Sequence, residues 1–87
     1  YADGIRRTLG NGKSMANING NLVPVVGTIC MDMMMVDVSE IDCKEGDEVV
    51  IFGENPNISQ YAKWLETIPY EVLTSISTRV QRVYYKE

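Results

Sequence analysis

The sequence predicts a mainly β fold: a small, closed, Greek-key-like antiparallel barrel with a short helical excursion at about residues 59–77. Three observations support this prediction. Short apolar or alternating runs of strand length recur along the chain, and an Asn-Gly pair at residues 19–20 is typical of a tight hairpin turn. The chain also has only 87 residues, 45% of them apolar, which suits a single domain, 1–87, with a modest core. Closing such a sheet into a barrel removes its exposed edges.

The first half of the chain contains a predicted loop followed by a hairpin. Residues 2–13 include three glycines and show little periodicity, which indicates a loop. A strand at residues 15–18 leads into the Asn-Gly turn at 19–20, where both positions tolerate positive φ. The returning strand is expected over residues 22–30. Because Pro24 lacks an N–H, we expect it at a sheet edge or a bulge.

A methionine-rich run follows the hairpin. Four of the five methionines fall within residues 31–35. We expect residues 33–38 to form a mostly buried core strand in which these side chains fill irregular gaps. Asp32 is harder to place, since a carboxylate in an apolar run needs a partner or a wet surface. Either the strand ends near Asp32, or an arginine such as Arg7 or a set of backbone amides meets the carboxylate.

The second half changes from strands to helices and back. Its predicted elements are, in order, a polar turn at 42–47, a strand at 48–52, helices at 60–65 and 69–77, and a half-buried strand at 79–85. Ser59 is the expected N-cap of the first helix. Pro69 suits the first turn of the second helix, whose Val72 and Ile76 belong to an apolar stripe that must pack on something.

Composition and charge exclude several kinds of function. The chain has no histidine, so Ser-His and Cys-His catalysis are excluded within it, and no metal site is expected. A net charge of −4 with scattered basic residues argues against binding nucleic acid or an anionic membrane, and no apolar run is long enough to span a bilayer. The two cysteines are expected to be reduced in a cytoplasmic protein, with Cys30 as a buried structural thiol because it lacks a neighbouring base.

The residues alone leave the activity open. Asp3, Asp32 and Asp37 can pair for acid–base chemistry, but nothing in their spacing requires it. Tyr70 directly follows Pro69 in the first turn of a predicted helix. Its hydroxyl and the nearby free N–H groups can therefore face an anion, although packing is the default role of a tyrosine. The residue pattern alone thus indicates a soluble β-rich domain but does not identify its activity.

Three stretches taken in order resemble the alanine racemase family. Y-A-D-G at residues 1–4, followed by Arg7, looks like a family loop, and V-V-G-T-I-C-M-D-M at 25–33 is similar to its V-G-x-[IV]-C-M-D signature. Residues 66–80 resemble the family segment that contains T-I-x-Y-E and, further on, I-S-x-R-V. The linking G-D-E-V-V-I-F-G at 46–53 also fits, so the resemblance covers essentially the whole chain.

The resemblance implies one domain of a two-domain enzyme. The family uses pyridoxal 5'-phosphate and belongs to fold type III. Its N-terminal (β/α)8 barrel carries the lysine that binds the cofactor, and this chain resembles only the C-terminal β-domain. The catalytic lysine and tyrosine lie upstream in the family, so no catalytic residue is expected in this chain. The barrel of one subunit meets the C-terminal domain of the other, which implies a homodimer.

The resemblance also implies roles for individual residues. Met31 offers its backbone N–H to the carboxylate of the substrate alanine, and Tyr70 hydrogen-bonds the cofactor phosphate. The other implied site residues are Tyr1 at the inner gate of the substrate channel with Tyr70 beside it, Arg7 and Ile68 one layer further out, and Asp32 as a supporting residue near the site.

The implied activity is the interconversion of L- and D-alanine, which supplies D-alanine for bacterial peptidoglycan in the cytoplasm. The isolated chain is expected to be inactive and to bind no cofactor, since both bases lie outside it. Two alternatives remain: a non-catalytic dimerisation or assembly barrel, and a racemase of another small amino acid such as serine.

Overall fold

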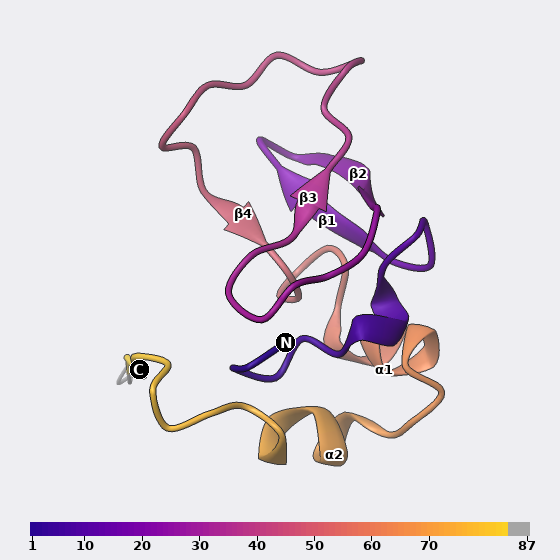
Figure 1. Cartoon of the computed structure of the whole chain (residues 1–87), viewed down its shortest axis with the longest axis vertical. Helices are drawn as coiled ribbons and strands as arrows, with labels where there is room; N and C mark the ends of the chain where they lie inside the picture. The colour runs from indigo at the N-terminus through magenta and orange to yellow at the C-terminus, as the bar shows by residue number, and fades with distance from the viewer. Residues whose placement is uncertain (84–87) are drawn as a thin grey trace.

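Within residues 1–83, the part of the chain that this computed structural model describes, four short strands form one antiparallel sheet (Figure 1). The strands, which lie side by side in the order β3-β2-β1-β4, are β1 (Met15–Ile18), β2 (Asn21–Val26), β3 (Met35–Val36) and β4 (Val49–Val50). The antiparallel, mainly β fold is therefore confirmed. Barrel closure is not seen in the described residues, because β3 and β4 form the two edges of a curled, half-open sheet.

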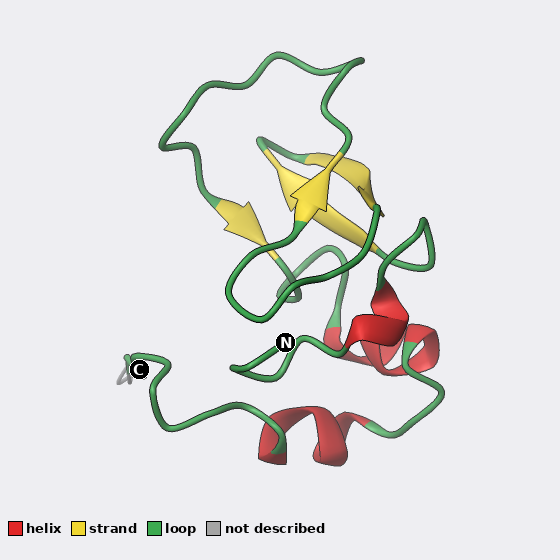
Figure 2. Ribbon diagram, viewed as in Figure 1, coloured by secondary structure: helices red, strands yellow, loops and turns green. Residues whose placement is uncertain are grey.

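The helices gather at one end of the sheet, close to the start of the chain (Figure 2). They are a 3-10 turn η1 (Arg7–Leu9) and the α-helices α1 (Ile58–Trp64) and α2 (Pro69–Thr74). The predicted helical excursion at 59–77 is thus confirmed. The long connection between β3 and β4 lies at the opposite end of the molecule, where the predicted polar turn at 42–47 occurs.

The β1–β2 hairpin forms as predicted. Asn19 and Gly20 have φ angles of 53° and 83°, the positive values that a type I′ turn requires, and Ile18 pairs with Asn21 across it. The second strand is shorter than expected and ends at Val26 rather than at residue 30. Gly27 has a φ of 67° and turns the chain out of the sheet.

Pro24 lies in the inner strand β2, so its predicted place at a sheet edge or bulge is wrong. The N–H of Val25 donates to the carbonyl of Ser14 at 2.9 Å on the β1 side, and Pro24 therefore faces the β3 side. There its carbonyl accepts from the Asp37 N–H at 3.0 Å, one residue beyond the end of β3. Because β3 has already ended, the missing proline N–H removes no hydrogen bond of the sheet.

The methionine run is not the buried core strand that was expected. Met31, Met33 and Met35 are 56%, 70% and 56% exposed, while Met34 is half-buried and packs against the core. The reason is that β3 is a two-residue strand at the sheet edge, so the rest of the molecule covers only one side of the run.

The predicted burial of the Cys30 thiol is also wrong. Cys30 is exposed, with its Sγ 3.7 Å from the carbonyl oxygen of Thr28, and Cys43 is half-buried; both are free thiols. The turn at Gly27 takes the chain away from the sheet before residue 30, which leaves the Cys30 side chain at the surface.

The hydrophobic core lies between the sheet and the helices. Its buried members come from η1, β2, the segment after β2, and both α-helices: Leu9, Val25, Ile29, Tyr61, Ala62, Leu65 and Val72. The ring of Phe52 packs on that of Tyr61, with centroids 5.1 Å apart. Burial raises the pKa of Tyr61 to about 12, so its hydroxyl stays neutral at physiological pH.

The start of α1 lies two residues earlier than predicted. Asn57, not Ser59, is the N-cap, and its side-chain oxygen accepts from the Gln60 N–H at 2.8 Å. Asparagine satisfies a free N–H of the first turn as serine does, and the first helical residue is then Ile58. Pro69 occupies the first turn of α2 as predicted, although α2 ends at Thr74 rather than at residue 77.

The predicted strand at 79–85 is not present over residues 79–83, and Tyr84 and Tyr85 lie outside the described residues. Arg79 instead sits in a turn, where its N–H donates to the Ser77 hydroxyl at 3.1 Å. Its guanidinium is bound to carboxylates of two other segments, which holds this part of the chain away from the sheet. None of the helices formed by residues 1–83 is long and apolar enough to cross a membrane.

The N-cap gives a first testable prediction. Replacing Asn57 by alanine removes the acceptor for the Gln60 N–H and should lower the free energy of unfolding of the purified chain by about 1 kcal/mol. Asn57→Asp keeps an acceptor and should retain most of the stability. Ser59→Ala is the matched control, measured by urea denaturation. A larger loss for Ser59→Ala than for Asn57→Ala would contradict the cap assignment.

Candidate functional site

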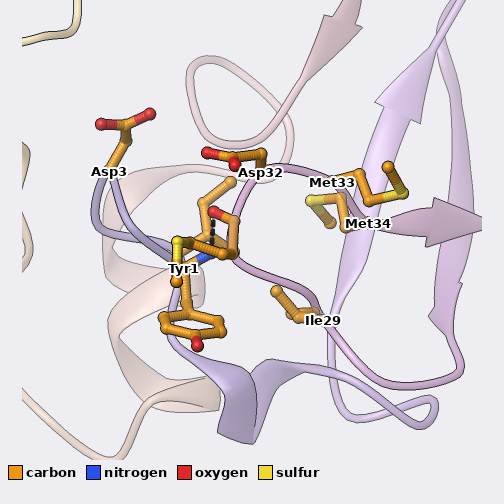
Figure 3. A pocket seen from close by; sticks show the side chains of 8 residues that line it. Tyr1, Asp3, Ile29, Asp32, Met33 and Met34 are labelled. Carbon is orange, nitrogen blue, oxygen red and sulfur yellow. Dashed lines mark hydrogen bonds between the residues drawn. The ribbon is translucent and has the colours of Figure 1, made fainter.

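An open hollow of about 140 Å³ lies where the first residues of the chain meet the segment after β2 (Figure 3). The residues that line it are Tyr1, Asp3, Ile5, Ile29, Met31, Asp32, Met33 and Met34. The first three belong to the N-terminal loop, and the others belong to the methionine-rich run. The structure thus brings together three of the predicted site residues, Tyr1, Met31 and Asp32.

Main-chain hydrogen bonds hold the two sides of the hollow together. The Ala2 N–H donates to the Met31 carbonyl at 3.0 Å. The free amino group of Tyr1, the first residue of this chain, lies 2.7 and 2.9 Å from the carbonyl oxygens of Cys30 and Met31, and Figure 3 draws the second contact. In a longer chain this nitrogen is a peptide N–H, which has a single proton to donate. The Cys30 N–H in turn donates to the Met33 carbonyl at 2.9 Å, which closes a tight turn. The backbone around Met31 is therefore fixed relative to Tyr1 without any contribution from the methionine side chain.

This arrangement determines where the Met31 N–H points. In a trans peptide the C=O and the N–H point in opposite directions. The carbonyl of the Cys30–Met31 peptide is bound by the Tyr1 nitrogen, so the N–H of that peptide points away from Tyr1. Among residues 1–83 this N–H has no acceptor. An anion that approaches Met31 therefore finds a main-chain donor available.

Asp32 lies outside the strands with its side chain 64% exposed, which agrees with the expected strand end, and its arginine neighbour is Arg79 rather than Arg7. Arg79 Nη2 lies 3.6 Å from Asp32 Oδ1 and 2.8 Å from Asp3 Oδ2, so one guanidinium bridges two carboxylates. Arg7 lies instead over the ring of Tyr1, with its Cζ 5.8 Å from the ring centroid. A cation over an aromatic face is attracted to it, which orients the Tyr1 ring at the rim of the hollow.

The other two predicted site residues, Tyr70 and Ile68, lie apart from this hollow at the start of α2. Both are exposed, Tyr70 by 75% and Ile68 by 63%. Tyr70 lines a second, open hollow whose other residues are Leu73, Thr74, Ile76, Thr78 and Arg82. Three hydroxyl groups and one guanidinium line it together with apolar side chains, and no carboxylate does. This set of donors fits a phosphate group, the part of the cofactor assigned to Tyr70.

An ion pair connects the N-terminal loop with α2. Arg6 Nη2 lies 2.8 Å from Glu71 Oε1, and Glu71 directly follows Tyr70. The Arg6 hydrogen bond, together with a smaller one from Thr67, holds the pKa of the Glu71 carboxyl below its usual value. The loop that carries Tyr1 is therefore tied to both segments that carry the predicted binding groups.

Sequence reasoning missed the role of Arg79, although the residue falls within the motif at 66–80, and considered Asp3 only as one of three carboxylates. The two residues are 76 positions apart in the chain, yet their side chains meet at 2.8 Å. No periodicity links positions so distant. The one available signal was that Asp32, a carboxylate in an apolar run, needed a cation.

The fold and the two hollows together define a class of protein: a small β-domain that offers binding groups at two places on its surface. Its described site has a main-chain donor, a tyrosine-lined rim and a set of hydroxyls suited to phosphate.

Comparison with known proteins identifies the family. Residues 1–84 match the family model described as "Alanine racemase, C-terminal domain". The chain is 46% identical over 88 residues to the alanine racemase of Helicobacter pylori strain J99, covering 97% of this chain and 23% of that protein. It is 50% identical over 92 residues to the alanine racemase of Clostridium novyi strain NT, covering 99% and 24%. The chain belongs to the alanine racemase C-terminal domain family.

Solved structures agree with this assignment. The alanine racemase of Bartonella henselae, a crystal structure with covalently bound pyridoxal phosphate, matches with a TM-score of 0.90 and 38% identity over 98% of this chain and 25% of that one. The Clostridium difficile 630 enzyme matches with a TM-score of 0.88 and 48% identity over 99% and 24%. This chain spans about a quarter of the length of these relatives.

The Arg6–Glu71 pair predicts a pH effect. Because the folded-state pKa of Glu71 lies below the ordinary value of 4.5, the pair adds stability above that pH, and the stability is lost as the pH falls through the folded-state pKa. Arg6→Gln should move the Glu71 pKa back toward 4.5 and weaken this acid dependence. Carbon-detected NMR titration of the Glu71 carboxyl measures it directly. An unchanged pKa in Arg6→Gln would contradict the assigned cause.

Proposed function

We propose that this chain is the C-terminal domain of a pyridoxal-phosphate-dependent alanine racemase that interconverts L- and D-alanine. The observation that carries the proposal is the main-chain geometry at Met31: its carbonyl is bound by the Ala2 N–H, and the Cys30 carbonyl oxygen faces the Tyr1 nitrogen at 2.7 Å, so the Met31 N–H is directed away from Tyr1. Family membership over residues 1–84 supports the same reaction. In a bacterial cytoplasm this reaction supplies D-alanine for peptidoglycan.

The Met31 N–H binds the carboxylate of alanine. A backbone donor suits this role because it recognises an oxyanion without adding a mobile charge, and because its position depends on the fold rather than on a rotamer. The methionine side chain, 56% exposed, is not needed for the contact. The pairing of a main-chain donor with a small open hollow favours a small substrate.

The phosphate of the cofactor is held at α2. Tyr70 donates its hydroxyl, and Thr78 and Arg82, which line the same hollow, add a second hydroxyl and a positive charge. When bound, pyridoxal phosphate supplies the electron sink that makes removal of the Cα proton feasible. The two bases that act on opposite faces of Cα come from outside this chain, at the lysine and tyrosine that the family carries upstream.

Tyr1 lines the narrow inner gate of the substrate channel with Tyr70 beside it in the assembled enzyme, and Arg7 and Ile68 lie one layer further out. The Arg7 guanidinium over the Tyr1 ring restrains the ring, and a restrained aromatic gate limits both substrate size and water entry. Exclusion of water protects the deprotonated substrate. Asp32 acts behind this gate by holding the turn that bears Met31.

The partner of this domain is the (β/α)8 barrel of a second subunit, so the enzyme is a homodimer. Several large apolar side chains near the predicted site are exposed, including Met31, Met33, Met35 and Ile68. Exposed apolar side chains in number favour an interface in the assembled protein. The unpaired edge strands β3 and β4 also favour an interface, because exposed strand edges tend to be covered. We infer that the sheet closes into a barrel in the intact enzyme.

Replacement of the Met31 backbone N–H by an oxygen atom tests the role of this donor. In the full-length enzyme, an ester in place of the Cys30–Met31 amide removes the N–H and keeps the side chain. The KM for alanine should rise at least about tenfold, because a charge-assisted hydrogen bond contributes about 1.5–3 kcal/mol. Met31→Leu is the matched control and should leave KM within about twofold. An ester variant with unchanged KM would exclude the Met31 N–H as the carboxylate donor.

The isolated chain gives a second test. It should not racemise L-alanine and should not acquire the absorbance of bound pyridoxal phosphate, since the reacting lysine and tyrosine lie outside it. The full-length enzyme, assayed in parallel on L-alanine and L-serine, should prefer alanine. Turnover by the isolated chain at the rate of the full enzyme would refute the claim that the reacting lysine and tyrosine lie outside it. A preference of the full-length enzyme for serine would change the proposed substrate.

A further inference from the structure

We infer that Arg79 is a positioning residue for the substrate carboxylate site. Its guanidinium binds the loop that carries Tyr1 and the turn that carries Met31, and thereby sets the width of the hollow between them. The inference rests on the proposed function, because the site that Arg79 positions is the one assigned to the alanine carboxylate. Nothing in the motif at residues 66–80 requires this role, since it depends on contacts between three distant segments.

The contacts are short and converge on one nitrogen. Arg79 Nη2 lies 2.8 Å from Asp3 Oδ2 and 3.6 Å from Asp32 Oδ1. Asp3 is two residues from Tyr1, and Asp32 is the residue after Met31. Figure 3 shows both carboxylates at the same rim of the hollow, on the two segments that enclose it. A change at Arg79 therefore acts on both walls at once.

The chemistry of arginine suits this bridge. Two carboxylates at one rim repel each other unless a cation lies between them. A guanidinium is planar, delocalised and weakly hydrated, so its Nη2 can lie between two carboxylates, whereas the ammonium of a lysine is a compact, strongly hydrated point charge on a flexible stem. Lysine at position 79 would keep the charge but not the geometry.

The segment that carries Arg79 is itself fixed to the N-terminal loop. The Ser77 N–H donates to the Asp3 carbonyl at 3.2 Å, and the Ser77 hydroxyl accepts from the Arg79 N–H at 3.1 Å. Gly4 has a φ of 118°, and a Cβ there would meet the carbonyl oxygen of Ser75 at 2.9 Å. The backbone of residues 75–79 thus lies directly against residues 3 and 4. The position from which the Arg79 side chain extends is therefore fixed relative to the N-terminal loop.

Arg79 attaches Asp32 to the N-terminal loop, which the main-chain hydrogen bonds do not do. The Tyr1 and Ala2 nitrogens bind the carbonyls on either side of Met31, but no backbone bond ties the following residue, Asp32, to the loop. The ion pair to Asp32 supplies that third attachment. This attachment, added to the bond between the Ala2 N–H and the Met31 carbonyl, limits tilting of the turn and so favours one direction of the Met31 N–H.

Loss of Arg79 should affect substrate binding more than the free energy of unfolding. The side chains of Arg79 and Asp32 are 69% and 64% exposed, and exposed ion pairs change the free energy of unfolding by only about 0–1 kcal/mol. Loss of Arg79 should therefore leave the fold nearly intact. Its effect should appear where a small displacement is costly, in the binding of the substrate carboxylate.

Kinetics of the full-length enzyme test the inference. Arg79→Gln should raise the KM for alanine and the inhibition constant of propanoate, which has the carboxylate but no amino group, by about two- to fivefold each, the range that a weak exposed ion pair allows. The value of kcat and the affinity for pyridoxal phosphate should change by less than about 1.5-fold. Arg79→Lys should recover only part of the loss, and Asp32→Asn should shift both constants in the same direction. Lys44→Gln, which removes an exposed positive charge from the turn at 42–47, is the matched control and should change neither.

Hydrogen exchange measured by mass spectrometry provides a readout that does not need activity. Peptides covering residues 28–35 should exchange faster in Arg79→Gln than in wild type or Lys44→Gln, with a thermal midpoint within a few degrees of wild type. An unchanged KM and inhibition constant, or equal effects in Lys44→Gln, would overturn the role of Arg79. Full recovery in Arg79→Lys would overturn the bridging geometry. A wild-type enzyme without racemase activity would refute the proposed function instead, and the exchange data would still test the bridge.

Discussion

The attachment of the N-terminal loop to the Met31 carbonyl through the Ala2 N–H is the contact on which the described site depends. This bond, 3.0 Å long, joins the loop to a turn about thirty residues later. It fixes the hollow, it orients the Met31 N–H, and it brings Asp3 and Asp32 to one rim where a single arginine can bind both. The same loop reaches α2 through Arg6 and Glu71. The tyrosine rim, the carboxylate donor and the phosphate hollow are therefore positioned from one short segment.

Under the proposed function, main-chain recognition explains how this domain would contribute to a reaction whose reacting groups the family resemblance places upstream. A catalytic base needs a suitable pKa and must lie within hydrogen-bond distance of the proton that it removes. Both requirements are met most easily by residues of the domain that holds the cofactor. A carboxylate donor needs only a fixed N–H, which a turn tied to a neighbouring loop provides. Binding and proton transfer can thus be divided between two domains, as the family resemblance implies. The exposed methionines and Ile68 beside the site are consistent with a surface that another domain covers.

Local features of the structure followed from the sequence, whereas long-range ones did not. The Asn19-Gly20 turn and Pro69 at the start of α2 were predictable because each depends on the conformational preference of one or two residues. Burial of the methionines was predicted wrongly, since periodicity cannot reveal that β3 is a two-residue edge strand. The need of Asp32 for a cation was foreseen, but its partner was not. Arg79 reaches Asp3 across 76 positions, a contact that depends on the whole fold.

The central claim is that the Met31 N–H receives the substrate carboxylate, and selective labelling measures it most directly. In the full-length enzyme labelled with 15N-methionine, titration with propanoate should move the Met31 amide proton downfield in a saturable manner, because a charge-assisted hydrogen bond forms at that atom. The amide of Met35, in the β3 ladder, should respond far less. A saturating titration in which the Met31 resonance stays in place would contradict the account.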